Sequence, residues 1–90
     1  MIIEVKRVGD NDFIVDVEVN GYRTKHNVHL DDTYYEKLTA KKVTKEELIK
    51  NSFEFLLERE SNSSILREFD LKVIQRYFPE YERLIKNWKK

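Results

Sequence analysis

The chain has 90 residues, of which 17 are Lys or Arg and 17 are Asp or Glu, and it contains no cysteine. This length predicts one domain, the charge balance argues against a strong overall attraction to nucleic acid, and the absence of cysteine excludes disulfides and thiolate metal sites. A charged fraction of 38% with two Gly and one Pro is compatible with ion-pair-rich proteins from hot environments, and the hypothesis that follows is a thermophilic source.

The first thirty residues alternate between apolar and polar side chains, the pattern of half-buried strands. Asn20-Gly21 is a favoured pair for a two-residue hairpin, because both positions of a type I′ turn need positive φ. This turn sets Glu18 opposite Arg23 and Asp16 opposite Lys25, two opposite-charge pairs that agree with the register. The inner face is expected to hold Phe13, Val15, Val17, Val19, Tyr22, Thr24, His26, Val28 and Leu30.

An earlier hairpin is predicted around a three-residue loop, Gly9-Asp10-Asn11. This loop length keeps Ile3 and Val5 on the core face, with Asn11 expected in the left-handed conformation. We therefore predict a three-stranded antiparallel meander over residues 1–30.

The strongest helical signal runs from Thr44 to Glu60, where apolar residues cover an arc of roughly 200° at ~100° per residue. A surface helix needs only about half that width, so we expect this helix to be covered by the sheet on one side and by further helices on the other. Thr44 and Glu47 form a capping box that starts the helix at about Lys45. A short helix before it is expected to begin at Asp31 or Asp32 and to end at about Leu38.

The C-terminal part is predicted to be helical. Ile65, Leu66 and Phe69 suggest a helical turn, Asp70 starts another segment, and Pro79 suits the first position of the last helix. That helix is predicted to bury Tyr81, Leu84, Ile85 and Trp88. The expected fold class is α+β: a three-stranded antiparallel meander followed by a long core helix and shorter C-terminal helices, with residues 31–90 forming a helical layer.

No set of residues predicts catalysis or cofactor binding. His26 and His29 lie three residues apart in a strand and point to opposite faces, so they cannot chelate one metal ion without a bulge. Asp31 and Asp32 are explained by helix capping, with a functional acidic patch as the alternative. The chain has no Gly-x-Ser-x-Gly motif and no glycine-rich phosphate loop. We expect a protein that is not an enzyme and needs no metal or cofactor.

A surplus of aromatic residues suggests an interaction surface, because exposed Tyr and Trp clusters mark interfaces. The partner would be another protein or a second copy of this chain, and the alternative is that these residues complete the core. No apolar run reaches the ~18 residues of a membrane span, so we expect a cytoplasmic protein with no membrane partner. The candidate interaction residues are Tyr22, Tyr34, Tyr35, Tyr77 and Trp88.

Nucleic-acid binding or regulation is the alternative function, since basic residues gather in the C-terminal third beside Tyr77 and Trp88. Asp70, Glu80 and Glu82 interrupt this basic surface, which makes nucleic acid the less expected partner. The candidate contacts are Arg67, Lys72, Arg76, Arg83 and Lys86, with Lys89 and Lys90 beyond them.

The segments Phe53-Glu54-Phe55-Leu56-Leu57-Glu58-Arg59-Glu60 and Arg76-Tyr77-Phe78-Pro79-Glu80-Tyr81-Glu82 resemble a family of small uncharacterised prokaryotic proteins. The resemblance covers about the last half of the chain, supports the fold and implies no activity. Thr44-Lys45-Glu46-Glu47-Leu48 is weakly similar to the helix start of HicB-type antitoxins, although the long Phe-rich helix departs from that pattern.

Overall fold

A computed structural model describes residues 1–88; Lys89 and Lys90 of the expected basic set lie outside the described residues. The strands are β1 (Ile2–Arg7), β2 (Asp12–Val19), β3 (Tyr22–His29) and β4 (Glu68–Asp70). The α-helices are α1 (Asp32–Thr39), α2 (Lys45–Leu57), α3 (Ile74–Tyr77) and α4 (Tyr81–Lys86), and two 3-10 helices are η1 (Asn62–Ser64) and η2 (Leu71–Val73).

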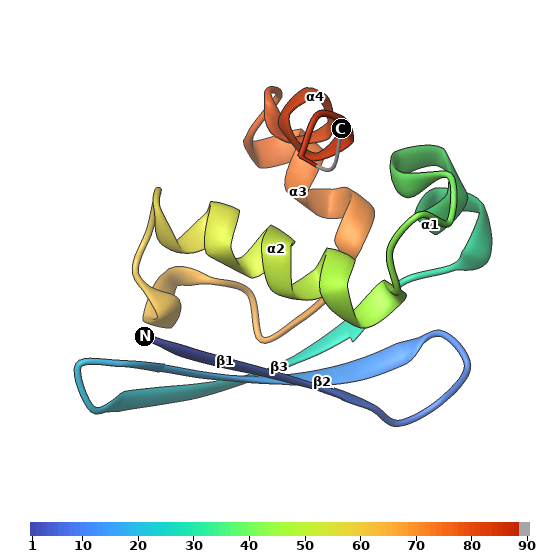
Figure 1. Ribbon diagram of the computed structural model, residues 1–90. Coiled ribbons are helices and arrows are strands. Elements are labelled where there is room, and N and C mark those ends of the chain that lie inside the picture. The colour runs from blue at the N-terminus through green and yellow to red at the C-terminus, as the bar shows by residue number, and fades with distance from the viewer. Residues whose placement is uncertain (89–90) are drawn as a thin grey trace.

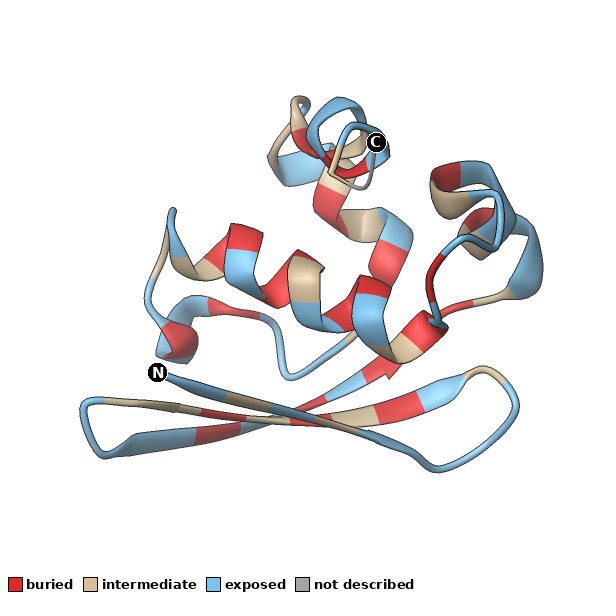
Figure 2. Ribbon diagram, in the orientation of Figure 1, coloured by how far each residue is buried: buried red, intermediate tan, exposed pale blue. Residues whose placement is uncertain are grey.

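The elements form three layers, with α2 lying between the sheet and the C-terminal helices α3 and α4 (Figure 1). This arrangement confirms that α2 is covered on two sides. Its buried residues include Leu48, Ile49, Phe53 and Leu56, and buried positions gather where α2 faces its neighbours (Figure 2). The predicted capping box is also present, because the Thr44 side chain accepts a hydrogen bond from the Glu47 backbone N–H.

The first three strands form the predicted antiparallel meander, and the α+β fold class is confirmed. Asn20 and Gly21 have φ values of 52° and 81°, as the type I′ turn requires. The expected cross-strand ion pairs are present, with 2.7 Å from Arg23 Nε to Glu18 Oε1 and 4.0 Å from the Lys25 ammonium to Asp16. The inner face is buried except for its end at the turn, where Val19 is half-buried and Tyr22 is exposed.

The sheet has four strands, which corrects two expectations. Residues 65–69 are not a helical turn: the chain is extended after η1 and adds β4 to β3 in parallel. The reason is the free edge of β3, where the Asn27 N–H donates to the Arg67 carbonyl oxygen at 2.8 Å. Residues 31–90 are therefore not a purely helical layer.

Three local expectations were also wrong. The first loop has the predicted register, with Val5 opposite Val15. Asn11, however, does not have the positive φ that was expected of it. The last helix starts at Tyr81, two residues after Pro79, because the Tyr81 N–H bonds the Phe78 carbonyl oxygen in a turn. Leu84, which was expected to be buried with Tyr81 and Ile85, is exposed in α4.

Candidate functional site

An apolar groove of about 150 Å³ lies between the end of α2, the segment from η1 to β4, and α3. Its floor contains the buried side chains of Leu56, Ile65 and Ile74. Its rim carries Leu66 and Tyr77, which are 47% and 65% exposed. We call this feature the Leu66–Tyr77 groove. A buried apolar floor under an exposed apolar rim can hold an apolar group from another molecule.

Core contacts hold one wall of the groove in place. His26 is fully buried in β3, and its Nδ1 lies 2.8 Å from the Leu66 carbonyl oxygen. Its Nε2 lies 2.8 Å from the Thr24 hydroxyl, so a neutral ring with the proton on Nδ1 satisfies both bonds. Burial lowers the pKa of His26, which favours that neutral form. The expected position of His26 on the inner face is confirmed, and its hydrogen bond fixes the backbone that presents Leu66.

Glu60 brings a carboxyl group to the lining of the groove. It lies just after α2 and is half-buried, and this burial raises its pKa. Among residues 1–88, no ion pair neutralises Glu60, whereas Arg59 beside it pairs with Glu58 and Glu80. The Leu66–Tyr77 groove therefore combines an apolar floor with an acidic group that has no cation partner in the described part of the chain.

The five candidate interaction residues do not form one surface. Tyr34 is buried, and its hydroxyl donates to Glu82 Oε2 at 2.9 Å, so its inclusion was wrong. Tyr35 and Trp88 are half-buried and pack against the core. Tyr22 and Tyr77 are exposed, but Tyr22 starts β3 at a sheet hairpin whereas Tyr77 ends α3 on the other side of α2 (Figure 1). Of the five, only Tyr77 lines the groove.

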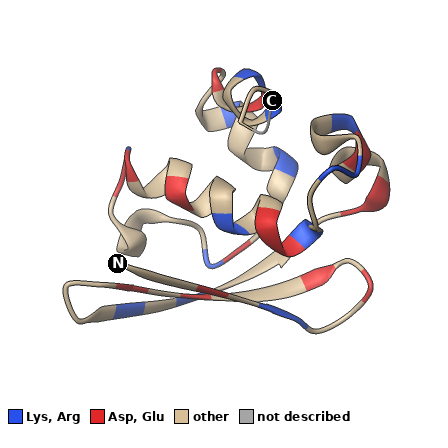
Figure 3. Ribbon diagram, viewed as in Figure 1, with Lys and Arg blue, Asp and Glu red and all other residues tan. Residues whose placement is uncertain are grey.

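The candidate nucleic-acid contacts are all exposed: Arg67, Lys72, Arg76, Arg83 and Lys86. Within residues 1–88 none of these five forms an ion pair by the distances between charged atoms. They are distributed over the segment before β4, η2, α3 and α4. Acidic and basic positions are interspersed over the helical layers, as Figure 3 shows.

Lys45 is a buried ammonium that sequence reasoning missed. Its side chain is 7% exposed and lies 2.7 Å from Asp32 and 2.8 Å from the Asn11 side-chain oxygen. It also donates to the Leu30 carbonyl oxygen at 3.3 Å. Its hydrogen bond and charge lower the pKa of Asp32. Lys45 thereby joins the first loop, the end of β3, α1 and α2. Because its donors already bind protein oxygens, we assign it no chemical role.

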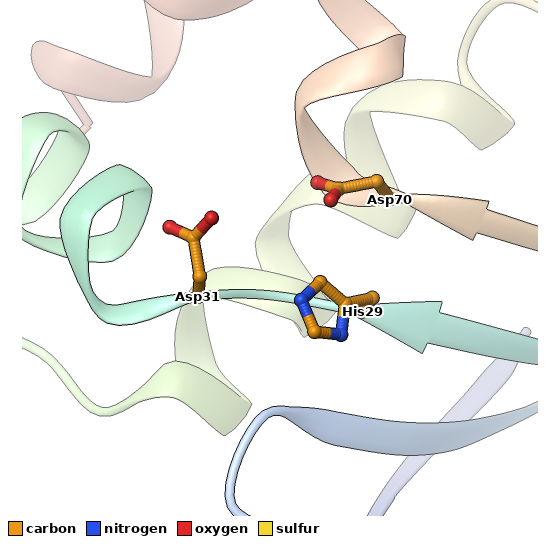
Figure 4. A group of neighbouring side chains, drawn as sticks. All are labelled: His29, Asp31 and Asp70. Carbon is orange, nitrogen blue, oxygen red and sulfur yellow. The ribbon is translucent and has the colours of Figure 1, made fainter.

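His29, Asp31 and Asp70 have ligand atoms within 4.8 Å of one another where β3 and β4 end (Figure 4). Each already has a structural partner: His29 Nδ1 contacts Asp12 at 3.1 Å, Asp31 accepts from the Tyr34 N–H, and Asp70 accepts from the Lys72 N–H. The group was not predicted, because Asp70 reaches His29 only through β4. Capping accounts for both carboxylates, so we assign no metal site to them.

No protein-family model, curated protein or solved structure matches the chain. The resemblance to small prokaryotic proteins therefore stays a prediction. Among the described residues, no helix has the length and apolar composition needed to cross a membrane.

Proposed function

We propose that the protein is a non-catalytic interaction module that binds another protein through the Leu66–Tyr77 groove. The occupant is a segment with one large apolar side chain and a neighbouring Lys or Arg. The observation that supports this proposal most strongly is the exposed rim of Leu66 and Tyr77 beside the half-buried carboxyl group of Glu60.

The size of the groove argues for a side chain as its occupant. Sites for drug-sized ligands usually enclose roughly 300 to 1,000 Å³, and this groove holds about 150 Å³. One large apolar side chain suits that space. The affinity would come from removing that side chain, Leu66 and Tyr77 from water together.

The position of Glu60 gives the preference for a basic neighbour. A partly desolvated carboxylate binds a cation more strongly than a fully exposed one does, because the local dielectric constant is lower. A Lys or Arg of the partner would favour the ionised form and offset the effect of burial on the pKa of Glu60.

A displayed library of short linear peptides tests this proposal. Selection on the wild-type protein is expected to enrich sequences with a large apolar residue next to Lys or Arg. Selection on Glu60→Gln should keep the apolar residue and lose the basic preference, because the amide fills the same space without the charge. Enrichment of acidic peptides, or no enrichment, would contradict the proposed occupant.

Two exposed tyrosines provide a matched pair of variants for the selected peptides. Tyr77→Ser is expected to weaken binding by roughly tenfold or more, since interface Tyr residues often contribute more than 1 kcal/mol. Tyr22→Ser, at a similarly exposed position outside the groove, should bind as the wild type does. If nuclease-sensitive nucleic acid were retained instead, with an affinity that falls steeply with salt, the basic C-terminal residues would be the functional surface.

A further inference from the structure

The strand β1 forms an open edge of the sheet, since the strand order is β1-β2-β3-β4. The Val8 N–H donates to the Asp12 carbonyl oxygen at 2.9 Å, so the even-numbered positions of this segment face β2. Because the direction of these backbone groups alternates along a strand, Ile3, Val5 and Arg7 point theirs away from the sheet. In Figure 1, β1 crosses the front of the sheet.

These outward groups are free within residues 1–88, where no backbone hydrogen bond from another segment reaches the odd-numbered positions of β1. A free edge of six residues is a template for another strand. The opposite edge, β4, is only three residues long. A partner strand is therefore expected to pair with β1 in preference to β4.

The residues of β1 complement a second copy of themselves. In an antiparallel pair centred on Val5, the Val5 residues of the two copies face each other and Glu4 lies opposite Lys6 of the second copy. Both Glu4–Lys6 pairs then fall at the closely spaced positions that have no backbone hydrogen bonds between them. The same register places Ile2 opposite Val8, two side chains that are 51% and 56% exposed in one copy.

Other symmetric registers lack this complementarity. Because side chains alternate between the two faces of a sheet, the two-fold axis must pass through a residue and not between two residues. Moving the axis by one residue along β1 changes the residue opposite each position by two. Moving the axis to Glu4 sets two glutamates opposite each other, and moving it to Lys6 sets two lysines opposite each other. Like charges directly across a strand pair are destabilising, so the register centred on Val5 is favoured.

On the neighbouring strand β2 of a single copy, neither Glu4 nor Lys6 lies opposite a residue of the other charge. Glu4 lies opposite Asp16 of β2, a like-charge pair, and Lys6 lies opposite the apolar Ile14. Neither residue forms an ion pair within the part of the chain that the structure describes.

We propose that two copies of this chain associate through their β1 strands, antiparallel and centred on Val5, into one continuous eight-stranded sheet. The occupant of this edge is a second copy, selected by the two Glu4–Lys6 pairs. The proposal is independent of the Leu66–Tyr77 groove, which includes Phe69 of β4 at the opposite edge of the sheet.

Two charge-reversal variants test the register, with sedimentation velocity over a concentration series as the measurement. The wild-type protein is expected to approach twice the chain mass of 11.0 kDa. Glu4→Lys alone places cations at both positions 4 and 6 of each β1, and Lys6→Glu alone places anions at both of these positions. Each should weaken self-association by roughly tenfold or more, because two attractive pairs become two repulsive ones.

Mixing the two single variants makes the test specific. The Glu4→Lys strand is complementary to the Lys6→Glu strand in the same register, so the mixture should form a heterodimer that neither variant forms with itself. The double variant Glu4→Lys/Lys6→Glu restores both pairs and should self-associate. Circular dichroism checks that each variant is folded. A wild-type protein that stays at 11.0 kDa throughout the series, or variants that associate equally well alone and mixed, would overturn the proposal.

Discussion

Lys45 connects four segments through one ammonium group. Its neighbours Asn11 and Leu30 lie 34 and 15 residues away in the chain. Lysine is seldom buried, and the capping-box pattern explains only why a helix starts at this position. The burial of Lys45 could not be predicted, because it depends on how the first loop and the end of β3 pack against α2.

Replacing Lys45 with Met is expected to lower the free energy of unfolding by about 1 to 3 kcal/mol, since the Leu30 carbonyl oxygen and Asn11 lose a buried donor. Methionine keeps most of the aliphatic stem, which limits the effect to the polar contacts. Urea unfolding measures the change. Lys50→Met, at an exposed position of the same helix, is the control and should stay within about 0.5 kcal/mol of the wild type. An equal loss of unfolding free energy in Lys45→Met and Lys50→Met would show that the Lys45 contacts contribute nothing.

His26 makes stability depend on pH. Burial lowers its pKa in the folded protein below the ordinary value of 6.5, so the unfolded chain binds a proton more readily than the folded chain does. The stabilisation from neutral His26 is complete above about pH 6.5 and is lost progressively as the pH falls from there through the lowered folded pKa.

Urea unfolding at a series of pH values between about 7 and about 5 tests this contribution. His26→Asn keeps a donor near the Leu66 carbonyl oxygen and removes the titrating group, so its free energy of unfolding should fall less with acidification. His29→Gln, at the exposed end of β3, keeps His26 and should therefore lose stability on acidification as the wild type does. An unchanged pH dependence in His26→Asn would contradict this role.

The helix α2 carries the core that joins the sheet to the C-terminal helices. Phe53 has no exposed surface, and its ring centroid lies 5.3 Å from that of His26 and 6.0 Å from that of Phe69. This one side chain therefore contacts residues of β3 and β4 through their rings. Its removal would leave a cavity between α2 and the sheet.

Phe53→Ala is expected to lower the free energy of unfolding by about 3 to 5 kcal/mol. Glu54→Ala, the exposed next residue of the same helix, should change it by less than about 0.5 kcal/mol. Thermal or urea unfolding of both variants gives the comparison. A loss below about 1 kcal/mol for Phe53→Ala would be inconsistent with the cavity expected in the core.

The elements that could be predicted are those with local signals. The turn at Asn20 and Gly21, the Thr44 capping box and the apolar face of α2 each depend on residues close together in the chain. β4 had no such signal, because three residues are too few for a clear alternation and the strand forms by pairing with Asn27 to His29 some 40 positions earlier.

The Leu66–Tyr77 groove is assembled from α2, the segment before β4, and α3. The aromatic surplus in the sequence pointed to an interaction surface, but only Tyr77 of the five candidates lines this groove. Tyr34 is the same residue type as Tyr77 and was predicted for the same surface, yet tertiary packing buries Tyr34 against Glu82. Sequence could indicate the type of residue at the site and could not place its walls.

The proposed interaction surfaces lie toward opposite edges of the sheet. β1 offers backbone groups and paired charges to a second copy, and the groove beside β4 offers an apolar floor and Glu60 to a different protein. A dimer formed through β1 would therefore carry two grooves, so a partner with two binding segments would bind with higher avidity than a partner with one.

Photo-crosslinking in cells tests the proposed function most directly. A benzophenone amino acid replaces Tyr77 in one variant and Tyr22 in the other, two exposed tyrosines of which only Tyr77 lines the groove. We predict that position 77 forms a covalent adduct with a discrete protein, that the groove-selected peptide suppresses this adduct in lysate, and that position 22 does not form it. Equal crosslinking from both positions, or adducts to nucleic acid alone, would contradict the assignment of the groove as the protein-binding surface.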